Sequence, residues 1–154
     1  MYIKKEKFIS AFAEIEDVLT NYSLPSWDAL PDIDLYMDQV VSVVTKYLDV
    51  PRTAIGGTRS ITPAMINNYV KLGIIPPPKK KKYSKVHLAY LLIVFTLKQT
   101  LDMSTIQRII PADIDEETFR KNYDSFVSNQ HTAFNYVIAQ TRAVADPIFT
   151  LEGD

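Results

Sequence analysis

The sequence predicts one all-α domain, and three observations point to it. Apolar residues recur at helical spacing in segments that prolines and glycines separate. With 154 residues, 47% of them hydrophobic, the chain can bury one ordinary core. It contains no cysteine, so neither disulfides nor thiolate-bound metals contribute to the fold. We therefore expect residues 1–154 to form a single helical domain.

Two helices are expected in the first third of the chain. The first covers residues 4–21, where apolar positions share one face: Phe8, Phe12, Ile15 and Leu19. A proline-rich connector follows, with Trp27 as its apolar anchor. The second helix is expected to begin near Asp34 and to end at Tyr47 or Leu48. Residues 49–60 contain one proline and two glycines, and we expect a loop there.

A short helix is expected next, because Thr62 is a suitable N-cap and Pro63 fits the first helical position. Gly73 is expected to end it in the left-handed conformation. The prolines at 76–78 then exclude helix, so an extended segment should run through Lys79–Lys82 to Tyr83.

The following helix, over residues 85–99 with Ser84 as its cap, is apolar on almost every side and should lie at the centre of the core. Ser104 and Gln107 fit a capping box for another short helix, which Pro111 stops. Residues 111–150 form the predicted C-terminal helical extension, as one or two helices that end at Pro147.

Charge is segregated along the chain although the total is only −1. Residues 51–110 carry ten Lys or Arg and one acid, a net charge of +9. The segments before and after it each carry a net charge of −5. A positive stretch of this kind favours a polyanionic partner, although charged residues also occur simply on solvated faces.

Enzyme, metal and cofactor functions are not expected. The two histidines lie 44 residues apart, no glycine-rich phosphate loop occurs, and no nucleophile elbow surrounds a serine. Residues 1–7 are charged, and the most apolar stretch, residues 88–97, is about half of a membrane span. We therefore expect a cytoplasmic protein with no membrane partner.

The positive segment has the order short helix, lysine-rich wing, buried helix, which suits a winged helix-turn-helix over residues 35–110. Asparagine can make a bidentate contact to adenine, and lysines on a wing neutralise phosphates. The candidate DNA-binding residues are Asn67, Asn68, Tyr69, Lys71, Lys79, Lys80, Lys81, Lys82, Tyr83 and Lys85.

Two resemblances rest on these residues. Residues 61–76 resemble the recognition helix and following turn of MerR-type winged-helix regulators, Lys81-Lys82-Tyr83 stands at the wing, and residues 101–106 resemble a later turn of that module. Asn67 and Asn68 replace the Arg and first Tyr of that family. A broader resemblance, over nearly the whole chain, is to a bacterial family of unknown function, number 1836. Its shared segments are Leu24-Pro25-x-Trp27, Leu30-Pro31-Asp32-Ile33, Met37-Asp38-Gln39-Val40 and residues 65–71.

The leading hypothesis is a transcriptional regulator that binds double-stranded DNA, and the alternative is a protein-interaction module of winged-helix shape without catalysis. No effector is indicated. The apolar positions of the C-terminal helices predict a homodimer, with intramolecular packing against the first helix as the open alternative.

Overall fold

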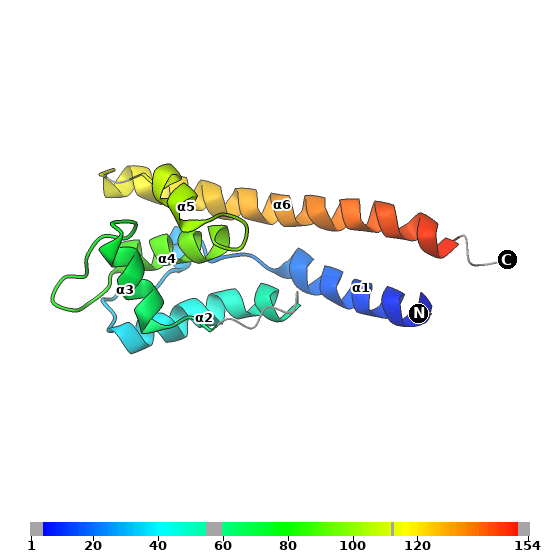
Figure 1. Cartoon of the computed structure of the whole chain (residues 1–154), viewed down its shortest axis with the longest axis horizontal. Helices are drawn as coiled ribbons and strands as arrows, with labels where there is room; N and C mark the ends of the chain where they lie inside the picture. The colour runs from blue at the N-terminus through cyan, green and yellow to red at the C-terminus, as the bar shows by residue number, and fades with distance from the viewer. Residues whose placement is uncertain (1–4, 55–59, 112, 151–154) are drawn as a thin grey trace.

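The computed structural model describes residues 5–54, 60–111 and 113–150, and within these ranges every regular element is helical (Figure 1). The elements are α1 (Lys5–Asn21), the 3-10 turn η1 (Trp27–Ala29), α2 (Met37–Ala54), α3 (Pro63–Lys71), α4 (Lys85–Leu97), α5 (Met103–Ile109) and α6 (Glu116–Thr150). The described part of the chain contains two isolated β-bridges and no longer strand. The predicted all-α class is therefore confirmed.

The helices form a head and an arm (Figure 1). The head, residues 22–127, contains η1, α2 to α5 and the first part of α6. The arm consists of α1 and the rest of α6, which run antiparallel and project from one side, so both ends of the chain lie there. No described helix is both long and apolar enough to cross a membrane.

Helix α4 is the centre of the head, as its sequence predicts. Leu88, Leu91 and Leu92 have no exposed surface, and α2, α3, α5 and α6 supply residues to the same cluster. Its hydrophobic side chains would each contribute about 1.5–3 kcal/mol on full burial. The core also fixes the position of α3, which carries four of the ten candidate DNA-binding residues.

The beginning of α6 belongs to this core. Phe119 and Tyr123 are buried, and both pack edge-on against Trp27, with ring centroids 6.0 and 6.2 Å away. Asp124 accepts the backbone N–H of Trp27 at 2.8 Å. Trp27 is thus the anchor that the sequence predicts. The C-terminal extension predicted over residues 111–150 starts inside the head, because its first aromatic side chains complete the core.

Three predicted boundaries are wrong. Helix α2 continues to Ala54 through Pro51, and α6 is one helix that continues to Thr150 through Pro147. A helical proline removes one hydrogen bond and crowds the carbonyl four residues earlier, but each of these prolines lies in the last turn, so only the three residues after it follow that interruption. The predicted loop 49–60 is therefore helical as far as Ala54, and residues 55–59 lie outside the described residues.

The third correction concerns the start of α5. Asp102, not Ser104, is its N-cap, and its carboxylate accepts the backbone N–H of Thr105 at 2.7 Å and the Ser104 hydroxyl at 2.9 Å. A carboxylate is favoured here because it meets the positive end of the helix dipole. Gln107 instead donates to the carbonyl of Leu72 at 2.8 Å, which joins α5 to the end of α3.

Candidate nucleic-acid interface

Helix α3 begins as the sequence predicts. The hydroxyl of Thr62 accepts the backbone N–H of Met65 at 3.3 Å, and Pro63 occupies the first turn. Ile66 and Tyr69 are buried against the core at 0% and 1% exposure. This amphipathic arrangement leaves three predicted DNA-binding residues on the solvent side: Asn67, Asn68 and Lys71.

Gly73 turns the chain out of α3. Its φ of +71° is the left-handed conformation that the sequence predicts, and its N–H donates to the carbonyl of Val70 at 3.0 Å. Ile74 and Ile75 follow as buried anchors. The segment after α3 therefore leaves from a fixed point and projects at the end of the head opposite the arm (Figure 1).

The predicted lysine-rich wing is a tight hairpin, which we call the lysine turn and define as Lys79–Lys82. The backbones of Lys79 and Lys82 exchange two hydrogen bonds, at 3.1 and 2.9 Å. Lys80 and Lys81 occupy the two central positions with φ of +50° and +62°. Positive φ at both positions is the requirement of a type I′ turn, which asparagine and glycine usually meet. The segment that was expected to be extended through Lys79–Lys82 instead reverses direction at Lys80 and Lys81.

The lysine turn is fastened to the head at its base. Tyr83 and Leu35 exchange backbone hydrogen bonds of 2.8 Å in both directions, and both side chains are buried. This pairing joins the lysine turn to the segment before α2. Tyr83, a predicted DNA-binding residue, therefore holds the lysine turn in place and presents no surface to a partner.

His87 makes a second attachment that the sequence analysis did not assign. Its Nδ1 accepts the backbone N–H of Ser84 at 2.9 Å, so Nε2 carries the proton and lies 3.2 Å from the carbonyl oxygen of Pro77. Burial lowers the pKa of His87, and nearby Lys79 acts in the same direction. A neutral imidazole thus links the N-terminus of α4 to the proline segment. The sequence does contain a signal for this role, because His87 stands three residues after the predicted cap Ser84, at the second position of a capping box.

Tyr69 is also a positioning residue. Its ring packs edge-on against Phe95 at 5.3 Å between centroids, and its hydroxyl accepts a hydrogen bond from Lys98 Nζ at 3.1 Å. It therefore fixes α3 on α4 and leaves no ring surface for a ligand.

The five predicted wing lysines fall into three environments. Lys79, Lys80 and Lys81 are exposed. Lys82 is half-buried, with Nζ 5.2 Å above the ring of Tyr36. The remaining lysine, Lys85, lies outside this group.

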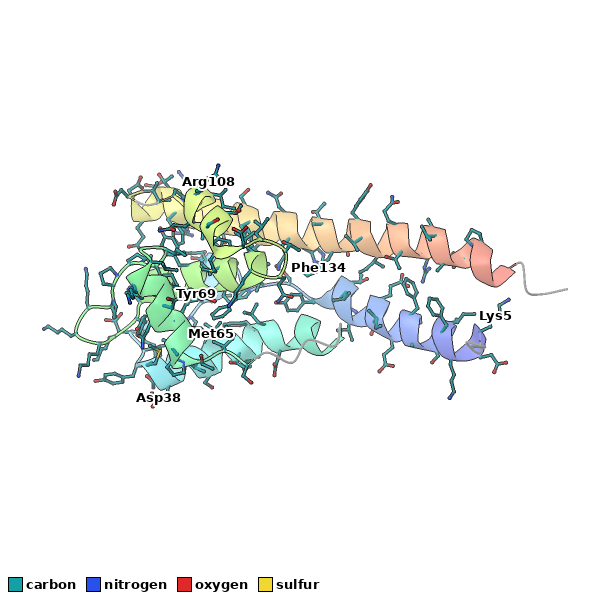
Figure 2. The ribbon with its side chains drawn as sticks, viewed as in Figure 1. Lys5, Asp38, Met65, Tyr69, Arg108 and Phe134 are labelled. Atoms are coloured by element: carbon teal, nitrogen blue, oxygen red, sulfur yellow. The ribbon has the colours of Figure 1, made fainter. Side chains whose placement is uncertain are left out.

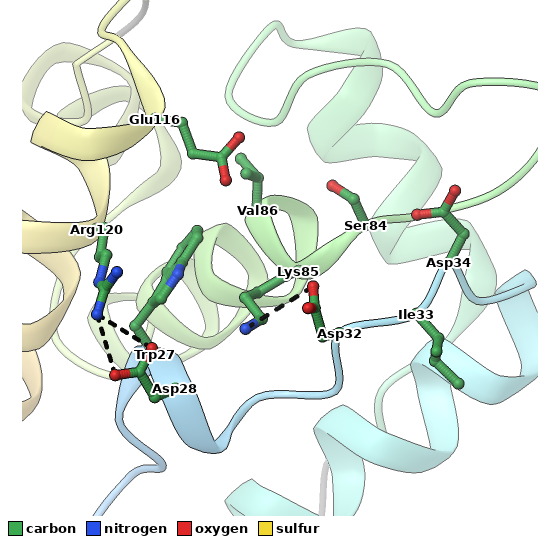
Figure 3. A pocket seen from close by; sticks show the side chains of 10 residues that line it. All are labelled: Trp27, Asp28, Asp32, Ile33, Asp34, Ser84, Lys85, Val86, Glu116 and Arg120. Carbon is green, nitrogen blue, oxygen red and sulfur yellow. Dashed lines mark hydrogen bonds and ion pairs between the residues drawn. The ribbon is translucent and has the colours of Figure 1, made fainter.

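Lys85 lies in a separate cleft of about 590 Å³ (Figure 3). Its side chain is only 15% exposed, with Nζ 4.0 Å from Asp32 and 5.7 Å above the Trp27 ring. Arg120 and Asp28 form a further ion pair there, at 3.0 and 3.1 Å. Four acidic residues line the cleft: Asp28, Asp32, Asp34 and Glu116. A phosphate would meet repulsion here, so the structure separates Lys85 from the other candidate residues.

Comparison with known protein families gives a match. The family model for a domain of unknown function (DUF1836) matches residues 25–135, from the connector around Trp27 to the middle of α6. No curated protein and no solved structure matches the chain. The matched segment includes α3 and the lysine turn, which form the candidate interface, and the whole of the central helix α4. Since it covers more than half of the sequence, the chain belongs to the DUF1836 family.

Proposed function

We propose that this protein binds double-stranded DNA through α3 and the lysine turn, in the manner of a winged helix-turn-helix, and acts as a transcriptional regulator. The observation that carries this proposal is the lysine turn itself. Lys80 and Lys81 hold positive φ in a turn for which lysine is poorly suited, and both side chains are exposed. Charged side chains in an unfavourable backbone conformation point to a function in ligand contact.

The chemistry of the surrounding surface fits a phosphate backbone. Between Asp49 and Asp102 the sequence contains no acidic residue, so no carboxylate from this segment opposes a polyanion. Lys71, Lys79, Lys80 and Lys81 are exposed and supply the phosphate contacts. Asp32 and Asp34 line the cleft around Lys85, which is not part of the proposed contact surface.

Sequence readout is assigned to α3. Asn67 and Asn68 are exposed on a helix whose opposite face is buried, so their amides are available to base edges. An α-helix is about 10–12 Å in diameter and enters a major groove about 12 Å wide. A bidentate asparagine–adenine contact contributes about 1–3 kcal/mol of discrimination.

Salt dependence tests this proposal. We expect the full chain to bind a random-sequence duplex in fluorescence anisotropy, with affinity that falls steeply from about 50 to about 200 mM salt. Each phosphate contact contributes roughly −0.9 to the log–log slope. Lys80→Gln with Lys81→Gln should therefore make the slope less negative by about 2.

The matched control is Lys5→Gln with Lys7→Gln, because both lysines lie on α1 and Lys5 is at the far end of the arm (Figure 2). This variant has the same net charge but should bind DNA as the unsubstituted chain does. Equal effects of the two double variants, or a slope near zero, would contradict the proposal. A slope near zero is the outcome expected of a protein-interaction module.

A further inference from the structure

The arm leaves part of its apolar surface uncovered. Glu16 of α1 forms an ion pair with Arg142 of α6, and the rings of Tyr22 and Phe134 pack edge-on at 6.1 Å between centroids. Yet Val137 and Val144 of α6 remain 58% and 67% exposed. The intramolecular packing that the sequence left as an alternative is present, and it covers only one face of α6.

The uncovered face carries no formal charge over most of its length. Residues 125–141 contain no Asp, Glu, Lys or Arg, although more than half of them are exposed. Soluble domains usually contain about 25% charged residues, whereas the centres of protein interfaces are depleted in them. This composition is typical of a helix face that another protein covers.

The residues of this face follow a coiled-coil spacing, from Phe126 and Gln130, which are half-buried at the joint with the head, to the exposed Val144. Steps of four and three alternate along a single seam: Phe126, Gln130, Ala133, Val137, Gln140 and Val144. Two copies of this series also match each other when the helices run antiparallel. In that arrangement Phe126 of one copy faces Val144 of the other, Gln130 faces Gln140, and Ala133 faces Val137. A large side chain thus faces a smaller one, and amide faces amide.

We propose that this face is a homodimer interface, in which α6 pairs antiparallel with α6 of a second copy about a two-fold axis beside Asn135. A two-fold interface requires that if one residue contacts another, the reverse contact also forms. The seam satisfies this requirement at all six positions. The glutamine pairs lie between the apolar pairs, where polar residues commonly fix the register. This inference is independent of DNA binding.

An apolar groove at the joint between head and arm supports the same register. It has a volume of about 530 Å³, and its lining includes Leu48, Leu97 and Phe134, of which Phe134 is labelled at this joint in Figure 2. Phe126 lines the same groove. Along one α6, Phe126 and Val144 are about 27 Å apart, so Val144 cannot reach the groove of its own chain. In the antiparallel pair, Val144 of the second copy lies over it.

Sedimentation equilibrium of the full chain at tens of micromolar should show a dimer. Val137→Glu places a charge near the centre of the seam and should give a monomer that keeps its helical circular dichroism. Val144→Glu, at the end of the seam, should weaken the dimer in the same way. Ala139→Glu is the matched control, because Ala139 is exposed on another face of α6. A monomeric unsubstituted chain, or equal effects of the Val137 and Ala139 substitutions, overturns the proposal.

Cysteine cross-linking tests the register, since the chain has no native cysteine. In the proposed pair, Gln130 faces Gln140 of the second copy, whereas the two copies of Gln130 are about 15 Å apart. A disulfide needs Cα atoms within about 7 Å. A mixture of Gln130→Cys and Gln140→Cys chains should therefore form disulfide-linked dimers, and neither variant alone should do so. Cross-linking of Gln130→Cys alone overturns the antiparallel register.

Discussion

Replacing the centre of the lysine turn with Lys80→Asn and Lys81→Gly should stabilise the protein and weaken its binding to DNA. Lys80 and Lys81 have φ of +50° and +62°, a region that costs an ordinary L-residue about 1–2 kcal/mol. Asn and Gly are the residues that type I′ turns prefer. Glycine also adds about 0.5–1 kcal/mol of chain entropy to the unfolded state, which offsets part of the gain. The net expectation is about 1 kcal/mol of added stability.

For a chain of 154 residues, this gain corresponds to a rise in Tm of about 2–4 °C. Thermal unfolding followed by circular dichroism measures it. The same variant lacks two cations, so the log–log salt slope of DNA binding should become less negative by about 2.

The control with Lys80→Gln and Lys81→Gln separates these two effects. It removes the same charges but keeps side chains that are unfavourable at positive φ, so it should weaken DNA binding without raising Tm. If the Asn-Gly variant is no more stable than the Gln-Gln variant, the turn does not store backbone strain. If both are more stable but bind DNA unchanged, the lysines have no part in binding.

Three further substitutions test the elements beside the lysine turn. Because burial lowers the pKa of His87, its contribution to stability is complete above the unfolded-chain value of about 6.5 and is lost as pH falls through that value towards the lowered folded-state pKa. Urea unfolding at about pH 7.5 and about pH 5.5 should show this loss in the unsubstituted chain, and a smaller one in His87→Gln. Gly73→Ala should cost about 1–2 kcal/mol, because φ is +71° while an added Cβ meets nothing within 4 Å; an unchanged urea midpoint would contradict this. Asn67→Ala should reduce affinity for a selected DNA site by about 1–3 kcal/mol and for random DNA by less, and equal losses would assign Asn67 to backbone contact.

The sequence predicted the elements of this fold correctly where a single residue type is suited to the backbone conformation that it adopts. Thr62 with Pro63 and Gly73 correctly marked the ends of α3, because capping and positive φ are chemical requirements of single residues. The apolar composition of α4 predicted its central position, since a helix without a polar face must be enclosed by apolar groups and α4, with 13 residues, is too short to cross a membrane. Prolines misled at the ends of α2 and α6, where a helix tolerates the loss of one hydrogen bond.

The candidate site was less predictable, because tertiary packing divides its residues. Tyr69 and Lys85 both lie in the positive segment of the sequence, but the core encloses one and an acidic cleft surrounds the other. The hairpin at Lys80 and Lys81 lacks the Asn-Gly signal that usually predicts a type I′ turn. The position of this hairpin is fixed at its base, where Tyr83 pairs with Leu35, a residue nearly fifty positions earlier in the chain. No local pattern contains that contact.

The two proposals together fix a spacing between DNA-binding surfaces. Helix α6 begins at the end of the head that carries the lysine turn, and the proposed two-fold axis lies beside Asn135 (Figure 1). In the antiparallel dimer, the first residues of the two α6 helices are therefore about 57 Å apart along the helix axis. One turn of DNA spans about 34–36 Å. In the proposed dimer, a separation of this size would suit half-sites nearer two turns apart than one. A short duplex would meet only one head, so dimerisation would strengthen binding only on longer DNA.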